Sequence, residues 1–280
     1  ATNGFDRILR IWNLESLSLV DQWPRMHSIS NCAMAFSPDG ASIVSPAADG
    51  SFQVRKVPSG EVLLTIPNDG FEPIAAVFSP DGTRIATTTR RGPVMVYSAV
   101  DGSGIASCAA EGTPWRVLFS PDGESVIATT WTHEIYVWNA RTGALRRRLT
   151  GHASLVTDAA FRPREDNILC SSSADGTIRL WDLSAESNTP ILTLSPPGGL
   201  AIWTLDLCPK NSELLCTDTS GATHRYLLRW FNQHIEGNLA SKYGLYKDRI
   251  EERLSESEVG ELAQALRKGT GALRDEFRKR

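Results

Sequence analysis

The chain has 280 residues, of which 41% are hydrophobic and 22% charged, so it can bury a substantial core. Its formal net charge of −3 gives no electrostatic reason to expect binding to nucleic acid, which needs a concentrated basic surface. No apolar run in the sequence approaches the roughly 20 residues that a membrane span requires. We therefore expect no nucleic acid and no membrane among its partners.

The first predicted elements are two strands, over residues 7–13 and 17–23, joined by a short turn. They fit the third and fourth strands of a four-stranded unit whose first two strands would precede residue 1. We therefore expect the chain to be the C-terminal part of a longer protein, in which it could contact an upstream domain. We also expect Trp12 to be incompletely covered on that side.

A five-residue motif recurs along the chain and joins strand-like segments. The letters FSPDG occur at residues 36–40, 78–82 and 119–123, and weaker copies begin at Phe161 and Leu207. Proline presets φ for the second position of a type I turn, and Asp-Gly completes that turn. Each copy therefore predicts a hairpin turn between the first and second strands of a repeating unit.

A second marker lies in the third strand of each unit. Alignment on DGTIRLWDL, residues 175–183, gives one key position at intervals of 41 to 45 residues. This position is occupied by Trp12, Arg55, Tyr97, Trp138, Trp181 and Tyr226. The period matches four-stranded propeller blades of about 40–45 residues. We predict complete blades over residues 29–66, 73–108, 114–149 and 155–194, and three strands over 200–228.

These repeats resemble those of WD-repeat β-propellers over residues 6–228, and the best copy covers residues 151–182. The resemblance implies an all-β fold with antiparallel blades, four of them complete and two partial, in a domain of residues 1–228. It also implies that a hydrogen-bonded set knits the best blade. The candidates for this set are His152, Ser171 or Ser173, Asp175 and Trp181. Each bond to a buried imidazole or indole would contribute about 1 kcal/mol.

The other copies depart from that pattern. In the second unit Arg55 takes the tryptophan position, although His27 and Asp49 match the histidine and aspartate positions. Thr132 replaces the aspartate in the fourth unit. We therefore expect most blades to depend on the packing of alternating apolar strands.

One predicted outer strand carries three consecutive arginines, Arg146, Arg147 and Arg148. Charged side chains on an edge strand hinder its pairing with another chain. The preferred interpretation is an edge strand protected by charge.

From residue 229 onward the strand pattern stops, and we expect a helical C-terminal extension over residues 229–280. Residues 255–258 form a capping box, which predicts a helix over residues 256–268. Its apolar stripe consists of Val259, Leu262, Ala263 and Leu266. This stripe either packs on the propeller or is offered to a partner or a second copy.

The sequence carries no catalytic signature. The five histidines show no H-E-x-x-H spacing, and neither G-x-S-x-G nor G-x-x-x-x-G-K-[ST] is present. The five cysteines form no C-x-x-C pair and fit small buried side chains in a reducing compartment. We therefore expect a cytoplasmic protein that is not an enzyme and needs no cofactor.

Propellers that this chain resembles present partner sites on the face that carries two sets of loops. Two aligned loop positions, with their neighbours, are occupied by Arg90, Arg91, Trp115, Trp131, His133 and Trp203. Tryptophan and arginine are strongly enriched at binding hot spots. We hypothesise that these residues bind a protein partner. The alternative is that the tryptophans fill gaps left by missing Gly-His pairs.

The predicted function is a non-catalytic platform for protein–protein interaction. The alternative is a sensory or regulatory propeller joined to an upstream signalling enzyme. FSPDG-rich repeats are similar to those of large bacterial signalling proteins, where propellers follow Ser/Thr kinase or nucleotide-dependent switch domains. That likeness concerns the fold and does not by itself establish function.

Overall fold

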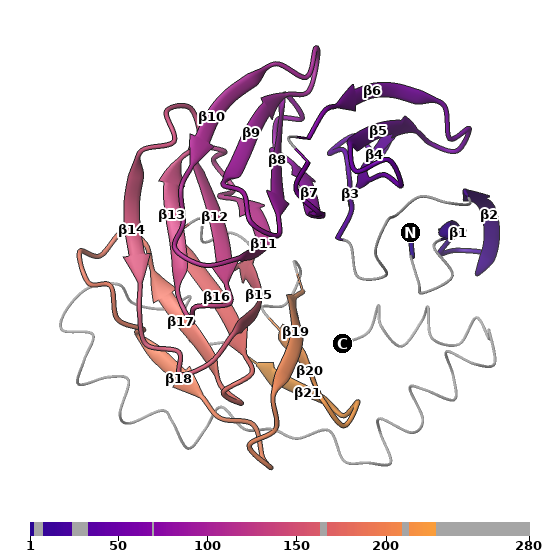
Figure 1. Ribbon diagram of the computed structural model, residues 1–280. Helices are drawn as coiled ribbons and strands as arrows, with labels where there is room; N and C mark the ends of the chain where they lie inside the picture. The colour runs from indigo at the N-terminus through magenta and orange to yellow at the C-terminus, as the bar shows by residue number, and fades with distance from the viewer. Residues whose placement is uncertain (3–7, 24–32, 69, 163–166, 209–212, 228–280) are drawn as a thin grey trace.

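Six antiparallel sheets follow one another along an arc in the computed structural model of the chain (Figure 1). The structure describes residues 1–2, 8–23, 33–68, 70–162, 167–208 and 213–227. All the elements assigned within these ranges are β-strands. The predicted helix over residues 256–268 lies outside the described residues.

Four sheets have four strands each, hydrogen-bonded in chain order. The first contains β3 (Ala35–Phe36), β4 (Ser42–Pro46), β5 (Phe52–Lys56) and β6 (Val62–Ile66). The second contains β7 (Pro73–Phe78), β8 (Arg84–Thr89), β9 (Val94–Ser98) and β10 (Gly104–Cys108). The third contains β11 (Pro114–Phe119), β12 (Ser125–Thr130), β13 (Ile135–Asn139) and β14 (Leu145–Leu149). The fourth contains β15 (Val156–Phe161), β16 (Ile168–Ser173), β17 (Ile178–Asp182) and β18 (Leu192–Leu194).

The two ends of the arc are smaller sheets. One contains β1 (Leu9–Asn13) and β2 (Ser18–Trp23), and the other contains β19 (Ile202–Leu207), β20 (Glu213–Asp218) and β21 (Thr223–Leu227). The order of strands confirms the all-β prediction of four complete antiparallel units and two partial ones. The periodicity succeeded because each unit repeats the same turns at nearly the same spacing.

Each FSPDG copy forms the turn between the first and second strands of its sheet. In the first copy, Ser37 Oγ donates to Asp39 Oδ1 at 2.5 Å and accepts from the Ser42 backbone N–H at 2.9 Å. The same pair of bonds recurs at Ser79 and Ser120. The predicted hairpin turns are confirmed. The serine, to which the sequence argument gave no role, closes each turn by bonding both its aspartate and the start of the second strand.

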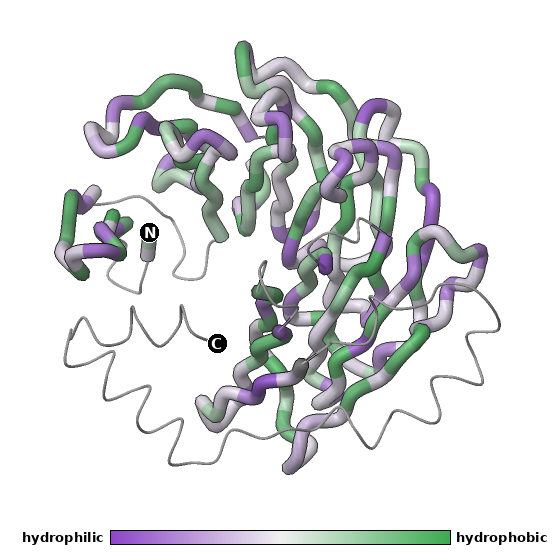
Figure 2. The backbone as a smooth tube through the Cα atoms, turned by 180° about the vertical axis from the view of Figure 1, so that it is seen from behind, coloured by the Kyte–Doolittle hydropathy of each residue, from purple (hydrophilic) through white to green (hydrophobic). Residues whose placement is uncertain are grey.

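The core lies between neighbouring sheets rather than inside any one of them. One buried cluster joins the β7–β10 and β11–β14 sheets and includes Val96, Phe119 and Trp138. Another joins the β15–β18 and β19–β21 sheets through residues such as Leu180 and Leu205. Figure 2 shows hydrophobic residues along the strands of successive sheets. Each sheet therefore depends on its neighbours for burial of its apolar faces.

A glycine in a tight turn allows two neighbouring sheets to approach closely. Gly143, in the turn between β13 and β14, has a φ of +72°. A Cβ atom at this position would lie 2.3 Å from the backbone oxygen of Ser107 in β10 of the preceding sheet. Gly40 has a nearly identical φ of +71°, but no atom lies within 4 Å of a Cβ built there. Comparing substitutions at the two glycines therefore distinguishes the cost of backbone strain from the cost of a packing clash.

Gly143→Ala should lower the free energy of unfolding by more than Gly40→Ala. Both substitutions carry the left-handed backbone cost of about 1–2 kcal/mol, and only Gly143→Ala must also displace a neighbouring backbone. We expect a total loss of about 3 kcal/mol or more at Gly143, measured by urea denaturation. Equal losses at the two positions would show that the turn does not hold the sheets in close contact.

Candidate functional site

A hydrogen-bonded set joins a loop, a turn and two strands of the β15–β18 sheet. His152 Nδ1 lies 2.9 Å from Asp175 Oδ2, in the turn between β16 and β17. His152 Nε2 lies 2.8 Å from Ser171 Oγ, which also accepts from Trp181 Nε1–H at 2.8 Å. Ser173 makes separate bonds, accepting from the backbone N–H of Asp175 at 3.0 Å. The structure therefore brings His152, Asp175, Trp181 and Ser171 together, rather than Ser173.

The distances fit one direction of proton donation through the set. The lowered pKa of Asp175 makes it a carboxylate, which only accepts, so His152 Nδ1 carries the ring proton and donates it to Asp175. In the neutral ring Nε2 then accepts from the Ser171 hydroxyl, whose oxygen accepts in turn from Trp181 Nε1–H. The set thus holds a neutral imidazole next to a carboxylate.

Burial and hydrogen bonding set the charges of these two groups. Desolvation lowers the pKa of His152, although its bond to Asp175 acts in the opposite direction. Burial alone would raise the pKa of Asp175. Hydrogen bonds from His152 and Thr177 nevertheless hold that pKa well below its usual value. Since the His152 side chain is fully buried, no substrate can reach it, and the geometry is that of a structural clasp.

In two other sheets the residue at the tryptophan position forms hydrogen bonds of a different kind. Trp138 Nε1 donates to the backbone oxygen of Ala109 at 3.1 Å. Arg55 donates to the backbone oxygen of Gly60 at 2.8 Å and to Gln53 Oε1 at 2.6 Å. Neither substitute reaches from the third strand back through a histidine to a turn aspartate. We therefore expect these sheets to depend more on apolar packing than the β15–β18 sheet does.

Two of the predicted partner-binding tryptophans contact each other. The rings of Trp115, in β11, and Trp131, directly after β12, have centroids 5.8 Å apart and are tilted by 50°. Trp115 is half-buried against the core cluster of its sheet, whereas Trp131 is 44% exposed. Trp115 therefore packs on the core and contacts a second tryptophan that faces solvent.

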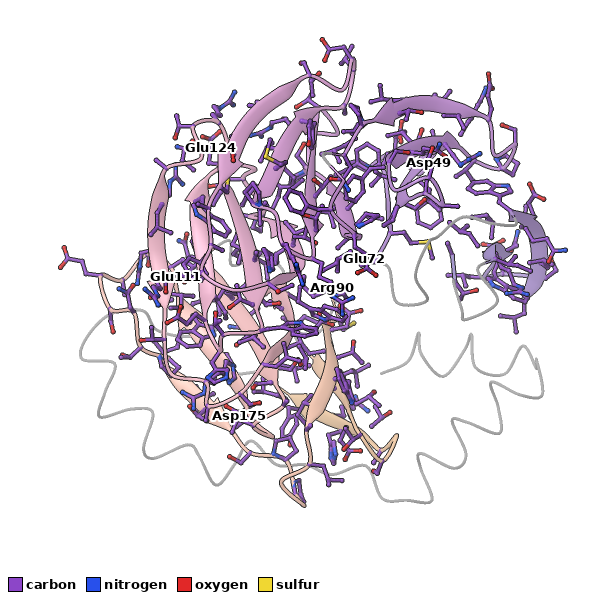
Figure 3. All side chains as sticks on the ribbon, viewed as in Figure 1. Asp49, Glu72, Arg90, Glu111, Glu124 and Asp175 are labelled. Atoms are coloured by element: carbon purple, nitrogen blue, oxygen red, sulfur yellow. The ribbon has the colours of Figure 1, made fainter. Side chains whose placement is uncertain are left out.

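The remaining candidates lie on loops and strands around this pair. Arg90 and Arg91 follow β8, and His133 lies in the equivalent turn of the next sheet with a φ of +73°. Arg90 Nη1 forms an ion pair with Glu72 Oε2 at 2.7 Å, and Figure 3 shows the two side by side. Trp203, in β19, is 49% exposed. Of these six residues, the structure brings Trp115 and Trp131 into ring contact.

A hydrogen-bonded link across three sheets was not predicted from the sequence. Arg116 Nε donates to Asp158 Oδ1 at 2.8 Å, and Thr204 Oγ1 donates to Asp158 Oδ2 at 3.0 Å. Burial would lower the pKa of Arg116, but the charge and hydrogen bonds of Asp158 raise it. The three residues lie in β11, β15 and β19. Each is three residues before the end of its strand. This shared position in the repeat could have predicted from the sequence that the three side chains meet.

The arginines of β14 do more than protect an edge. Arg147 Nε donates to Asn188 Oδ1 at 2.7 Å, and its guanidinium also contacts backbone oxygens of the loop between β17 and β18. Arg148 forms ion pairs with Glu134 at 2.7 Å and Glu111 at 2.9 Å. Arg147 therefore ties the β11–β14 sheet to the next one.

Two features are absent from the part of the chain that the structure describes. Within it, no group of three or more His, Cys, Asp or Glu side chains is placed to hold a metal ion. Nor does any helix described there have the length and apolar character to cross a membrane.

Known proteins share this repeat. Residues 143–182, which contain the clasp, match the family model described as WD domain, G-beta repeat. The chain belongs to the WD40-repeat family. It is 32% identical over 244 residues to Periodic tryptophan protein 2 homolog of Mus musculus, a match that covers 75% of this WD40 chain and 24% of that protein.

Two further relatives match less of their own length. WD repeat and HMG-box DNA-binding protein 1 of Xenopus laevis is 24% identical over 230 residues, covering 80% of this chain and 16% of that protein. Transcriptional corepressor LEUNIG_HOMOLOG of Arabidopsis thaliana is 34% identical over 95 residues, covering 33% of this chain and 11% of that protein. The WD40 chain thus spans a quarter or less of these relatives.

Ser171→Ala should destabilise the protein by about 1–3 kcal/mol, because it leaves the buried Nε atoms of His152 and Trp181 without their common partner. The measurement is the free energy of unfolding in urea. Ser187→Ala removes an exposed hydroxyl that bonds to nearby Thr189 in the loop between β17 and β18; it is the matched control and should change stability by less than about 0.5 kcal/mol. Similar losses for both variants would contradict a stabilising clasp.

The lowered pKa of His152 predicts a pH dependence of stability. Below the ordinary value of 6.5, the unfolded state binds the proton that the folded state excludes, so stability falls as pH decreases. Between about pH 7.5 and 5.5, His152 should account for a loss of at most about 1.4 kcal/mol. Asp175 does not contribute in this range because its pKa is lowered from 3.8.

His152→Gln should remove this part of the dependence, giving a flatter profile than the wild type. A direct measurement is the NMR titration of the His152 ring, which should show a pKa below 6.5. A ring that titrates above 6.5 would mean that the bond to Asp175 outweighs burial.

Proposed function

We propose that this chain is a non-catalytic interaction platform that binds a protein partner on the face carrying Trp131 and Trp203. WD40 propellers are typically non-catalytic, which supports this proposal. The observation that carries it is the exposure of these two tryptophans, at 44% for Trp131 beside the complete β11–β14 sheet and 49% for Trp203 in the three-stranded end sheet. Exposed tryptophan is costly in water and is enriched where partners bind.

The loops on this face are held in place by the backbone. In four successive sheets, the residue after the second strand donates its N–H to the oxygen of a residue just before the first strand. The bonds are Arg90 to Glu72 at 2.8 Å, Trp131 to Thr113 at 3.1 Å, Ala174 to Leu155 at 2.9 Å and Thr219 to Ala201 at 3.0 Å. A surface fixed in this way loses little conformational entropy when a partner binds.

Charge is available beside the tryptophans. Arg91 and His133 are exposed in adjacent turns, and Arg90 is held by Glu72. An apolar centre with cationic neighbours favours a peptide or loop that carries an apolar anchor and an acidic residue.

The proposal can be tested with linear peptides selected from a random-sequence display library on the immobilised full chain. Trp131→Ala combined with Trp203→Ala should weaken binding of the selected peptides at least tenfold, with an unchanged melting temperature. Leu145→Ala, an exposed apolar residue on β14, is the matched control and should leave binding unchanged. A library that yields no binder, or binders indifferent to both tryptophans, would contradict the proposal.

A further inference from the structure

One turn on the loop face has a backbone conformation that its residue disfavours. His133, in the turn between β12 and β13, has a φ of +73°. The other sheets that contain this turn have a glycine at the equivalent position, and Gly50, Gly176 and Gly221 have φ values between +79° and +86°. The left-handed region is unfavourable for a residue with a Cβ atom, whereas glycine enters it readily. His133 therefore lowers stability at a position where glycine would not.

Hydrogen bonds on both sides hold this turn in place. The backbone N–H and the hydroxyl of Thr130 both donate to the backbone oxygen of Glu134, at 3.1 and 2.8 Å. Thr132 Oγ1 donates to the backbone oxygen of Glu111, before β11, at 3.0 Å. Backbone strain persists only where the surrounding structure over-determines the conformation, as these bonds do. The ring of His133 is thus presented from a fixed backbone on the loop face.

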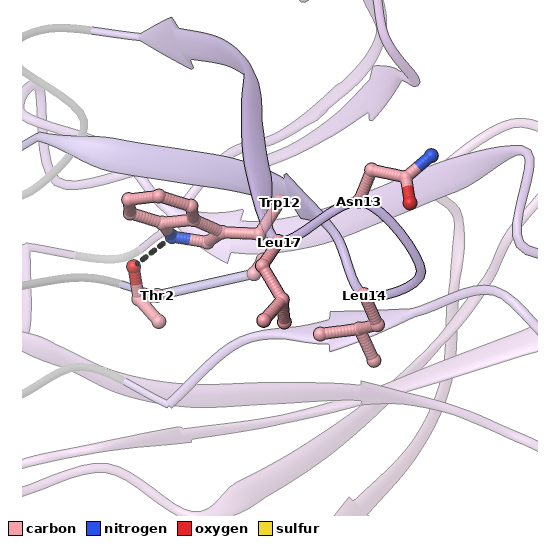
Figure 4. Close-up of a pocket in the computed structure, with 6 residues that line it drawn as sticks. Thr2, Trp12, Asn13, Leu14 and Leu17 are labelled. Carbon is pink, nitrogen blue, oxygen red and sulfur yellow. Dashed lines mark hydrogen bonds between the residues drawn. The ribbon is translucent and has the colours of Figure 1, made fainter. Parts of the chain in front are cut away.

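The surroundings of His133 do not account for a histidine in this position. Its side chain is exposed, and its charge acts weakly on Glu134. The pKa of Glu134 is lowered most by the hydrogen bond from Arg148 and least by the charge of His133. Among the described residues, Leu17 also has a positive φ without being glycine, at +53°, and it lines a pocket of its own hairpin with Trp12 (Figure 4).

We propose that His133 determines the specificity of the loop face by donating a ring N–H hydrogen bond to an acceptor oxygen of the bound peptide. This inference rests on the proposed function of that face. An imidazole donates at least one N–H bond in either protonation state, so a carboxylate or a backbone carbonyl can accept it. Trp131 lies two residues earlier and is 44% exposed, so the apolar anchor of the same peptide binds beside this donor. A donor fixed in advance discriminates against peptides that lack the acceptor.

Peptides selected on the wild-type full chain test this assignment. His133→Gly should raise the melting temperature by about 1–3 °C, because backbone strain is relieved. The same variant should weaken peptide binding about fivefold or more, because one hydrogen bond is lost. His133→Asn tolerates the left-handed region and keeps an N–H donor, so affinity should stay within about threefold of wild type. Gly221→His is the matched control for strain and should lower the melting temperature.

Two further measurements separate the possible causes of a lost affinity. Hydrogen exchange of the Trp131 backbone N–H should be the same in His133→Gly and in wild type, which excludes a loosened turn. A double-mutant cycle pairs His133→Gly with Asp→Asn or Glu→Gln in the peptide. Non-additive losses assign a carboxylate as the acceptor, and additive losses at every such position assign a backbone carbonyl.

Three results would overturn the role of His133: a lower melting temperature for His133→Gly, faster exchange at Trp131, or unchanged affinity. If peptide binding still depends on Trp131 and Trp203 in such a case, the proposed function stands without this contact. A library that yields no binder would contradict the proposed function itself, and the role of His133 with it.

Discussion

Face-to-face packing of neighbouring sheets is the constraint on which the rest of this structure depends. A four-stranded sheet has two apolar faces and cannot bury either one alone. The buried clusters accordingly join one sheet to the next, as Val96 and Phe119 do. Trp12 shows the consequence at the end of the arc, where a ring that is buried in complete sheets stays partly in solvent.

Polar groups restrict the relative orientation of the sheets that this apolar packing holds together. Asp158 joins β15 to Arg116 on one side and Thr204 on the other, and Arg147 reaches the loop between β17 and β18 of the next sheet. These bonds restrict how successive sheets are oriented, because a buried carboxylate such as Asp158 carries a large desolvation cost when its hydrogen-bond partners move away. The His152 clasp acts within one sheet and ties its turns to its strands. We expect the bonds between sheets and the bonds within the His152 clasp to restrict the motion of the loop face.

Much of the fold could be predicted from the sequence, since turns and strand alternation are local properties. The FSPDG turns and the 41–45 residue period located every complete sheet. Local pattern could not choose between Ser171 and Ser173, because residues two apart point to the same face of a strand. It also could not show that Trp115 supports Trp131, since that contact joins two strands and depends on how deeply each ring is buried. The Arg116–Asp158 pair could have been predicted from the sequence, because both residues occupy the same position in the repeat.

The backbone hydrogen bonds of the loop face imply that this face is rigid before any partner binds. Amide hydrogen exchange of the free protein measures this most directly, at the backbone N–H groups of Arg90, Trp131, Ala174 and Thr219. Each is bonded to the loop before the first strand of its own sheet. We predict that these four exchange as slowly as the amides of strands β8 and β12. Exchange at the rate of unprotected turns would show that the sheets are packed but that the loop face is not preorganised.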